Sequence, residues 1–61
     1  MGYNMVTRGS KWYSTEMRLF EVRDVEQRSD GVWVSYGRYG EDRTYECLVD
    51  AFLERFREHV N

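Results

Sequence analysis

Residues 49–60, which read VDAFLERFREHV, carry the clearest periodicity in this chain. At the helical advance of about 100° per residue, the five large apolar side chains of this stretch fall within an arc of about 100°, and Ala51 points the opposite way. Asp50 lies in the first turn and Arg55, Arg57 and His59 lie in the last two, which suits the helix dipole. We therefore predict a helix over residues 49–60 whose apolar stripe rests on a core. The residues of that stripe are Val49, Phe52, Leu53, Phe56 and Val60.

The stretch before the helix predicts a β-hairpin. Apolar residues recur at every second position over 32–36 and again over 45–47, which is the period of a strand. Residues 37–42 between them contain two glycines and an acidic pair, a composition typical of a loop. The apolar face of this hairpin is the nearest surface on which the helix can bury its phenylalanines.

Residues 16–26 form the longest extended candidate upstream of the hairpin. Met17 and Leu19 face one way, whereas Phe20 and Val22 face the other. This change of phase between Leu19 and Phe20 predicts either a strand covered on both faces or a β-bulge at that point. Ser29-Asp30-Gly31 then predicts a turn, because glycine takes positive φ without steric cost.

The first residues indicate a less ordered start. Residues 1–11 contain two glycines and several polar residues, so we expect a loose N-terminal extension. Within it we predict a short strand at Tyr3–Val6 and a turn at Arg8-Gly9-Ser10. A further segment begins at Trp12 and must be partly buried.

Taken together, the sequence predicts one domain over residues 1–61 in the α+β class. Its three or four short antiparallel strands would form a small curled sheet, a partial barrel, followed by one C-terminal helix. A strongly twisted meander of this size tends to curl, and the helix can then close one end of it.

A 61-residue chain buries only about 60% of its unfolded surface, so the expected core is marginal. One cysteine cannot form an internal disulfide, and one cysteine with one histidine cannot complete a Cys/His metal site. Two Trp, five Tyr and three Phe remain as the source of stability. Dense aromatic packing, a second copy of the chain, or both must then stabilise the fold.

The formal net charge of −2 argues against a protein that binds nucleic-acid phosphates through a basic patch. No apolar run approaches membrane-spanning length, and no signal peptide is visible. The single thiol without a partner fits a reducing compartment. We therefore expect a cytoplasmic protein that uses neither a membrane nor nucleic acid.

No pattern of residues predicts catalysis. Cys47 is expected to be a small buried apolar residue, because His59 is too far along the helix to act as its base. Glu41 and Asp42 form a lone acidic pair, whereas hard cations require six or more oxygen ligands. We expect a protein that is not an enzyme and that holds neither a metal nor a cofactor.

The large aromatic residues exceed what so small a core can hold, so some must be exposed. Trp33 and Tyr45 are expected in the core, whereas Arg38 and Tyr39 are expected at a loop tip. Exposed aromatics with arginine neighbours are typical of protein interfaces, and also of base-stacking platforms. The candidate partner-binding residues are Trp12, Tyr13, Tyr36, Arg38, Tyr39, Glu41 and Asp42.

The order of several short motifs over residues 12–57 resembles a group of small, uncharacterised SH3-like domains encoded by phages, prophages and bacteria. The motifs are Leu19-Phe20-Glu21-Val22, Val32-Trp33-Val34-Ser35-Tyr36, Tyr39-Gly40-Glu41-Asp42, Tyr45-Glu46-Cys47 and Phe52-Leu53-Glu54-Arg55-Phe56. Many members of the group have a proline where the helix begins, whereas this chain has Leu48-Val49-Asp50. The resemblance implies a fold and a mobile-element setting, and it implies no activity.

We therefore expect a non-enzymatic binding protein. One specific form is a phage or prophage accessory factor that binds and inhibits a host protein, such as a component of a defence system. A nucleic-acid-binding module that uses aromatic stacking is the alternative, and a binder of a small nucleotide ligand is a further one. We also expect a homodimer that buries Trp12, Tyr13 or an edge strand.

Overall fold

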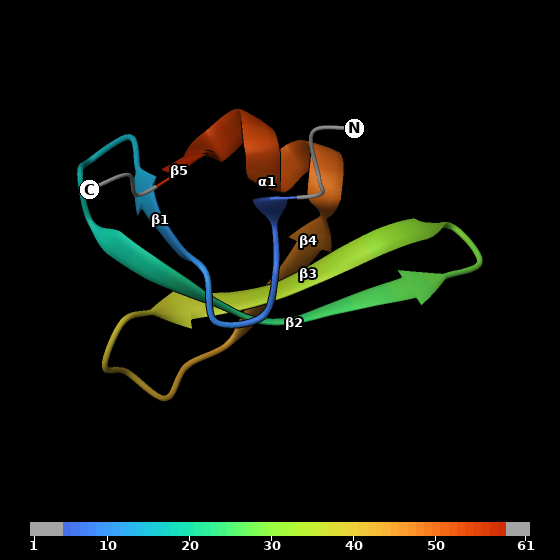
Figure 1. Ribbon diagram of the computed structural model, residues 1–61, viewed down its shortest axis with the longest axis horizontal. Coiled ribbons are helices and arrows are strands. Elements are labelled where there is room, and N and C mark those ends of the chain that lie inside the picture. Colours follow the sequence, from blue (N-terminus) through green and yellow to red (C-terminus); the bar gives the residue numbers. More distant parts are fainter. Residues whose placement is uncertain (1–4, 59–61) are drawn as a thin grey trace.

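The computed structural model describes residues 5–58, and its strands form one antiparallel sheet (Figure 1). The order across the sheet is β4-β3-β2-β1-β5. Helix α1 connects β4 to β5 and packs over one face of the sheet (Figure 1). The bounds are β1 Lys11–Ser14, β2 Leu19–Arg28, β3 Gly31–Arg38, β4 Tyr45–Leu48, α1 Val49–Arg55 and β5 Phe56–Glu58. The predicted α+β class is confirmed, with five strands instead of three or four and with a sheet that does not close.

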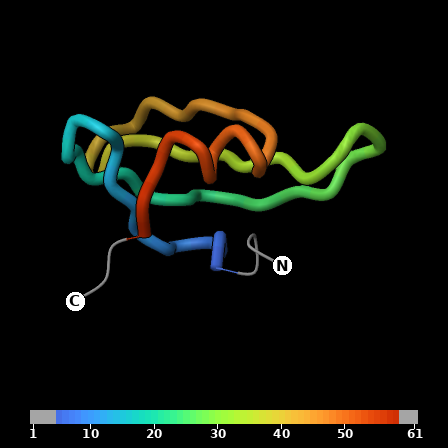
Figure 2. The backbone as a smooth tube through the Cα atoms, turned by 90° about the horizontal axis from the view of Figure 1, so that it is seen from above, coloured from blue at the N-terminus to red at the C-terminus, as the bar shows by residue number. Residues whose placement is uncertain are grey.

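Strands β2 and β3 form a long hairpin that projects beyond the other elements (Figure 2). Its turn consists of Ser29 and Asp30, since Arg28 pairs directly with Gly31. Gly31 has φ 137°, a conformation that a residue with a Cβ rarely adopts. The predicted turn at 29–31 is therefore confirmed.

A β-bulge does interrupt β2, but not where the sequence placed it. Val22 pairs with Tyr36 and Asp24 pairs with Ser35, so Arg23 is the extra residue. The bulge lets Val25 face the same core as Val22, although the two are three positions apart. The predicted change between Leu19 and Phe20 is wrong because Met17 lies outside β2, in a turn where its φ is 63°.

Helix α1 begins at Val49 as predicted, but it ends at Arg55 instead of continuing to residue 60. Phe56 takes an extended conformation and opens β5, where it pairs with Ser14 of β1. Pairing with β1 gives the backbone of residues 56–58 the partners that another helical turn would have supplied. The apolar pattern did not reveal where the helix ends, because Phe56 is buried in the strand as it would be in the predicted helix. His59 and Val60 lie outside the described residues.

The N-terminal segment that is described is tied to the sheet, which corrects the expected loose extension. Val6 is buried in the core, and Gly9 N donates to Val22 O at 2.7 Å. Ser10 accepts a hydrogen bond from Trp12 Nε1 on its hydroxyl at 2.9 Å. The turn at 8–10 is confirmed. The predicted strand at Tyr3–Val6 is not formed at Met5 and Val6, and its first two residues lie outside the described range.

The core lies between the sheet and α1, where buried valines and Cys47 surround a cluster of aromatic rings. Phe52 has no exposed surface and lies edge-on to Trp12, with ring centroids 5.2 Å apart. It also stacks on Phe56 at 4.5 Å and meets Tyr36 at 5.4 Å. Such ring pairs contribute about 0.5–1.5 kcal/mol beyond the area they bury. Contacts between aromatic rings therefore contribute stability in a chain that can form neither an internal disulfide nor a Cys/His metal site.

Candidate functional site

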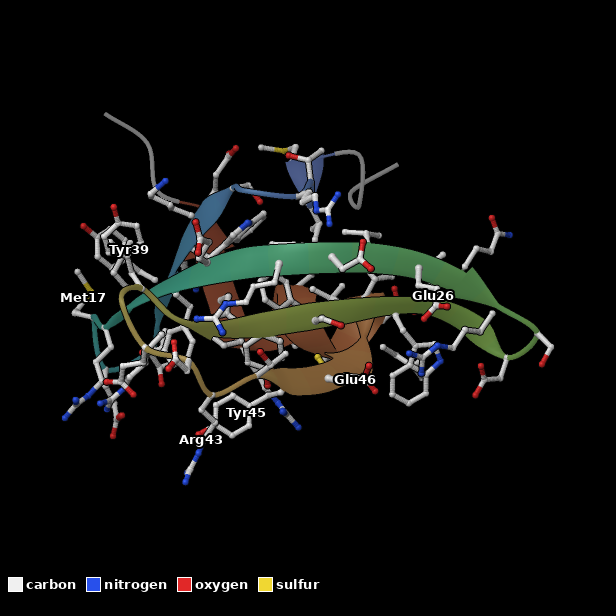
Figure 3. The ribbon with its side chains drawn as sticks, turned by 90° about the horizontal axis from the view of Figure 1, so that it is seen from below. Met17, Glu26, Tyr39, Arg43, Tyr45 and Glu46 are labelled. Atoms are coloured by element: carbon white, nitrogen blue, oxygen red, sulfur yellow. The ribbon has the colours of Figure 1, made fainter. Side chains whose placement is uncertain are left out.

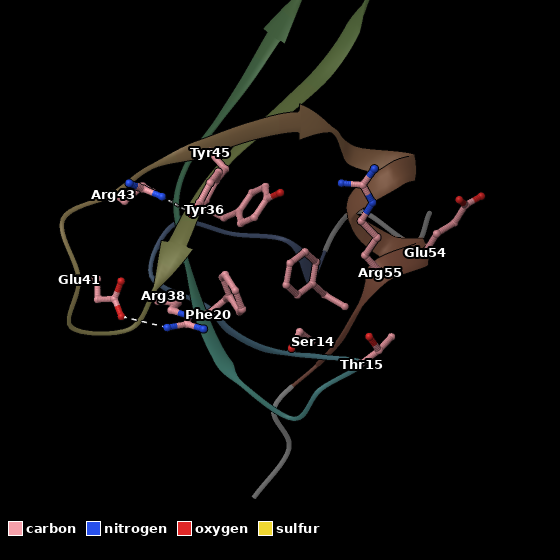
Figure 4. A pocket seen from close by; sticks show the side chains of 11 residues that line it. Ser14, Thr15, Phe20, Tyr36, Arg38, Glu41, Arg43, Tyr45, Glu54 and Arg55 are labelled. Atoms are coloured by element: carbon pink, nitrogen blue, oxygen red, sulfur yellow. Dashed lines mark hydrogen bonds and ion pairs between the residues drawn. The ribbon is translucent and has the colours of Figure 1, made fainter.

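One end of the curled sheet is open and forms a cleft of about 670 Å³ among the described residues (Figure 4). We call it the mouth cleft. Its wall comes from the ends of β1 and β3, the starts of β2, β4 and β5, and the last turn of α1. The sequence brings these segments together because β4 and β5 are the outer strands of a sheet that curls without closing.

The floor of the mouth cleft is aromatic. Phe20, Tyr36 and Phe56 lie against one another, with centroids 5.0 Å apart for Phe20–Phe56 and 5.2 Å for Tyr36–Phe56. Tyr45 continues this surface outward and lies 5.7 Å from Tyr36. Tyr36 and Phe56 are buried and Phe20 is half-buried, so the floor belongs to the core, and Tyr45, which is 43% exposed, extends it to the surface.

Three arginines stand around this floor. Arg38 pairs with Glu41 at 3.3 Å, and Arg43 donates to the Tyr45 hydroxyl at 3.4 Å (Figure 4). Arg55 comes from the last turn of α1, on the other side of Tyr36 (Figure 4). Among residues 5–58, neither Arg43 nor Arg55 forms an ion pair with a carboxylate. The rim can therefore supply unneutralised guanidinium groups.

The β3–β4 loop that carries half of this rim is held by Arg23, the bulged residue. Its guanidinium donates at 3.0–3.1 Å to Arg38 O, Asp42 O, Arg43 O and Thr44 Oγ1, and it also donates to Glu41 O. A Cβ at Gly37 would overlap the Arg43 carbonyl and lie 2.8 Å from Arg23 Cζ. Gly37 thus leaves the space in which Arg23 crosses β3 to reach the loop.

Two weak acids lie beneath the cleft. Burial raises the pKa of the Tyr36 hydroxyl, and the nearby Cys47 raises it further while Arg55 opposes the shift. Burial also raises the pKa of the Cys47 thiol, again opposed by Arg55. Both groups therefore stay protonated at neutral pH. A protonated, buried thiol is a poor nucleophile, and the prediction that Cys47 is a small buried residue is confirmed.

The structure divides the predicted partner-binding residues among several places. Arg38 and Glu41 lie on the rim of the mouth cleft, with Tyr36 on its floor. Tyr39 is 56% exposed at the loop tip, and Asp42 is exposed in the same loop. Tyr39 and Met17 lie at this same end of the molecule (Figure 3).

Several positions differ from the sequence expectation. Trp12 is only 3% exposed and lies in the core, because it faces Phe52 across the sheet–helix interface. Tyr13, its neighbour on β1, is half-buried. Tyr45 was expected in the core but is 43% exposed, since it begins the edge strand β4; Trp33 is half-buried.

Sequence reasoning missed Phe20, Arg43 and Arg55 as members of the site. Arg55 was assigned only to the helix dipole, although helix position places it one residue before the buried Phe56. Arg43 follows the Glu41-Asp42 pair of the predicted loop, but its contact with Tyr45 was hidden because Tyr45 was predicted in the core. The cleft itself could not be inferred without the strand order.

Within residues 5–58, no group of three or more His, Cys, Asp or Glu side chains is placed to hold a metal ion. No helix in the described part of the chain is long and apolar enough to cross a membrane. Comparison with protein-family models, curated proteins and solved structures finds no match.

Proposed function

We propose that this chain is a non-enzymatic binding domain, an SH3-like partial barrel, that holds a segment of another protein in the mouth cleft. The observation that carries the proposal is a cleft with an aromatic floor, continued to the surface by the exposed Tyr45, between the two outer strands of the sheet. Aromatic side chains in a preformed hollow with arginine at the rim are typical of the centre of protein interfaces. The strand order, a meander whose last strand returns beside β1, supports the SH3-like assignment.

The sequence resemblance to phage and prophage domains gives this proposal its setting. A small binding domain of that origin acts by attaching to a host protein, and a defence component is the form we favour. The predicted homodimer stays a prediction. With Trp12 in the core, it would use Tyr13 or the free edge of β4 or β5.

The test compares the parent chain with Tyr45→Ala and with Tyr39→Ala. The two changes are chemically matched because each removes a tyrosine side chain. Tyr45 lines the cleft, whereas Tyr39 is exposed at the loop tip outside it. Each chain is immobilised and exposed to bacterial lysate, and a retained protein is then purified and titrated. We expect at least tenfold weaker binding for Tyr45→Ala and near-parent binding for Tyr39→Ala. Equal affinity of all three chains would contradict the proposal.

Nucleic acid is the second candidate, because an aromatic floor with arginines at its rim also suits base stacking and phosphate contact. The overall charge of −2 disfavours it. We expect no appreciable binding of single- or double-stranded oligonucleotides at physiological salt in a fluorescence titration. Tight binding that weakens steeply as salt rises would favour this candidate over the protein partner.

A further inference from the structure

We infer that the segment bound in the mouth cleft is acidic and extended, with an apolar side chain on the aromatic floor and carboxylates toward Arg43 and Arg55. This inference rests on the proposed function and adds the chemistry of the partner. The net charge of the cleft lining differs in sign from that of the whole chain. The cleft is lined by three arginines and two glutamates, a net of 3 − 2 = +1, whereas the whole chain carries −2. The rest of the molecule therefore carries −3, and the cleft is a positive site on an acidic protein.

The two rim cations without a carboxylate are placed on opposite sides of the floor. Arg43 lies beside Tyr45 on the loop side, and Arg55 lies on the helix side, with Tyr36 between them (Figure 4). Arg38 is already paired with Glu41, while the Glu54 side chain points away from the floor (Figure 4). A segment that crosses the floor thus meets a guanidinium group at each side. Charge-assisted hydrogen bonds to a carboxylate are among the stronger polar contacts.

The extended form follows from the sheet. β4 and β5 are its outer strands, so each has one edge without a strand partner among residues 5–58. An extended segment can pair its backbone with such an edge while every second side chain points to the same face. The alternation would place one apolar residue on the floor and leave the flanking acidic residues to reach the rim.

The rim is held in place before any partner arrives. Arg23 holds the β3–β4 loop on both sides of Arg43, through the carbonyls of Asp42 and Arg43 at 3.1 Å and the Thr44 hydroxyl at 3.0 Å. Because that anchor uses the backbone, the Arg43 side chain stays available. A rim fixed in advance loses less conformational entropy on binding, which favours a short linear segment as the partner.

The inference is tested by selecting a random linear-peptide display library, balanced in acidic and basic residues, against the parent chain. We expect enriched peptides with at least two Asp or Glu flanking an aromatic or aliphatic residue. One such peptide is synthesised together with its isosteric form, in which Asn and Gln replace the acids. The neutral form should bind about tenfold or more weakly, and the difference should shrink as salt rises.

The arginines are tested on the same peptide with Arg43→Gln, Arg55→Gln and the control Arg57→Gln. Arg57 is an exposed arginine two residues beyond Arg55 and outside the mouth cleft, so its loss should change affinity less than twofold. Each rim change should weaken binding about five- to tenfold. Thermal melts of all variants confirm that the fold is kept.

The outcomes separate the two claims. Two results would overturn the acidic inference: enriched peptides that lack acidic residues, or peptides whose binding neither rim change weakens. If Tyr45→Ala still abolishes the binding of those peptides, the proposed function stands. Enrichment of no peptide, or only of peptides that bind the Tyr45→Ala chain equally well, overturns both.

Discussion

The two ends of the β2–β3 hairpin are each organised by one arginine of β2, and the two arginines work in opposite ways. At the turn end, Arg28 pairs with Glu26 at 2.8 Å and with Glu46 at 3.0 Å, and its guanidinium lies 4.9 Å from the Trp33 ring centroid. At the mouth end, Arg23 forms no ion pair among the described residues. It binds backbone carbonyls of the β3–β4 loop instead.

The difference shows how a small domain can keep side chains free for a partner. The turn end is held together by contacts between side chains, because Arg28 binds the carboxylates of Glu26 and of Glu46, the residue after Tyr45 in β4 (Figure 3). The β3–β4 loop is held by its backbone, so its arginine and tyrosine side chains remain at the surface. Order in a loop therefore does not require that its side chains be used internally.

The largest expected effect comes from the aromatic cluster beneath the mouth end. Phe52→Ala removes a ring with no exposed surface that contacts Trp12, Tyr36 and Phe56, so it should lower the free energy of unfolding by about 3–5 kcal/mol. Trp33→Ala at the turn end should cost less than half as much, because Trp33 is only half-buried. Urea unfolding measures both. Equal losses would show that the two ends share stability evenly.

The second effect concerns the Arg23 anchor. Arg23→Gln removes the guanidinium from its carbonyl acceptors and should lower the free energy of unfolding by about 1–3 kcal/mol. Amide hydrogen exchange at residues 39–44 should accelerate, while exchange in the Ser29–Asp30 turn stays at the parent rate.

Gly37→Ala provides an independent route to the same result. Its Cβ would meet the Arg43 carbonyl and Arg23 Cζ, so the loop must move away from β3. Ser35→Ala, on the same strand and without such a neighbour, is the matched control. Unchanged loop exchange in both Arg23→Gln and Gly37→Ala would mean that the loop is ordered by something other than this anchor.

Local periodicity predicted most of the fold. Alternation located β3 and β4, the apolar stripe located the start of α1, and Gly31 marked the turn. The end of α1 was missed because Phe56 fits a helical stripe and a strand equally well, and only β1 as a partner decides between them. The bulge was misplaced for a related reason. Its position depends on the register with β3, which leaves no mark in the sequence of β2.

The site was predicted less completely than the fold. Arg38 and Glu41 were found because loop tips expose their residues, and both lie on the rim. Trp12 was misplaced because an aromatic surplus shows how many rings must be exposed but not which ones. Arg55 was missed because its role depends on a neighbour across the cleft, Tyr36, that is distant in the sequence.

Alkaline pH should lower the free energy of unfolding of the domain. Burial raises the pKa of the Cys47 thiol above its ordinary 9.0, so above that pH the unfolded chain loses a proton that the folded chain keeps. Stability is then full below about pH 9 and falls as pH rises, with Tyr36 adding a further fall above its ordinary 10.0. Urea unfolding from pH 7 to 11 should show a shallower decline for Cys47→Ala than for the parent. If the free energy of unfolding falls equally with pH in both chains, the thiol does not contribute to the pH dependence.

The smallest effect is expected at Arg28. Its two carboxylate partners, Glu26 and Glu46, are both exposed, so water and salt screen the pairs and Arg28→Gln should lower stability much less than Arg23→Gln does. The difference between parent and Arg28→Gln should shrink further between low salt and 0.5 M salt, whereas the Arg23→Gln difference should persist because its acceptors are backbone carbonyls. Thermal melts at both salt concentrations measure this. A large, salt-independent loss for Arg28→Gln would instead indicate that stacking on Trp33, not ion pairing, holds the turn end. The contrast between an end held by charges and an end held by backbone would then fail.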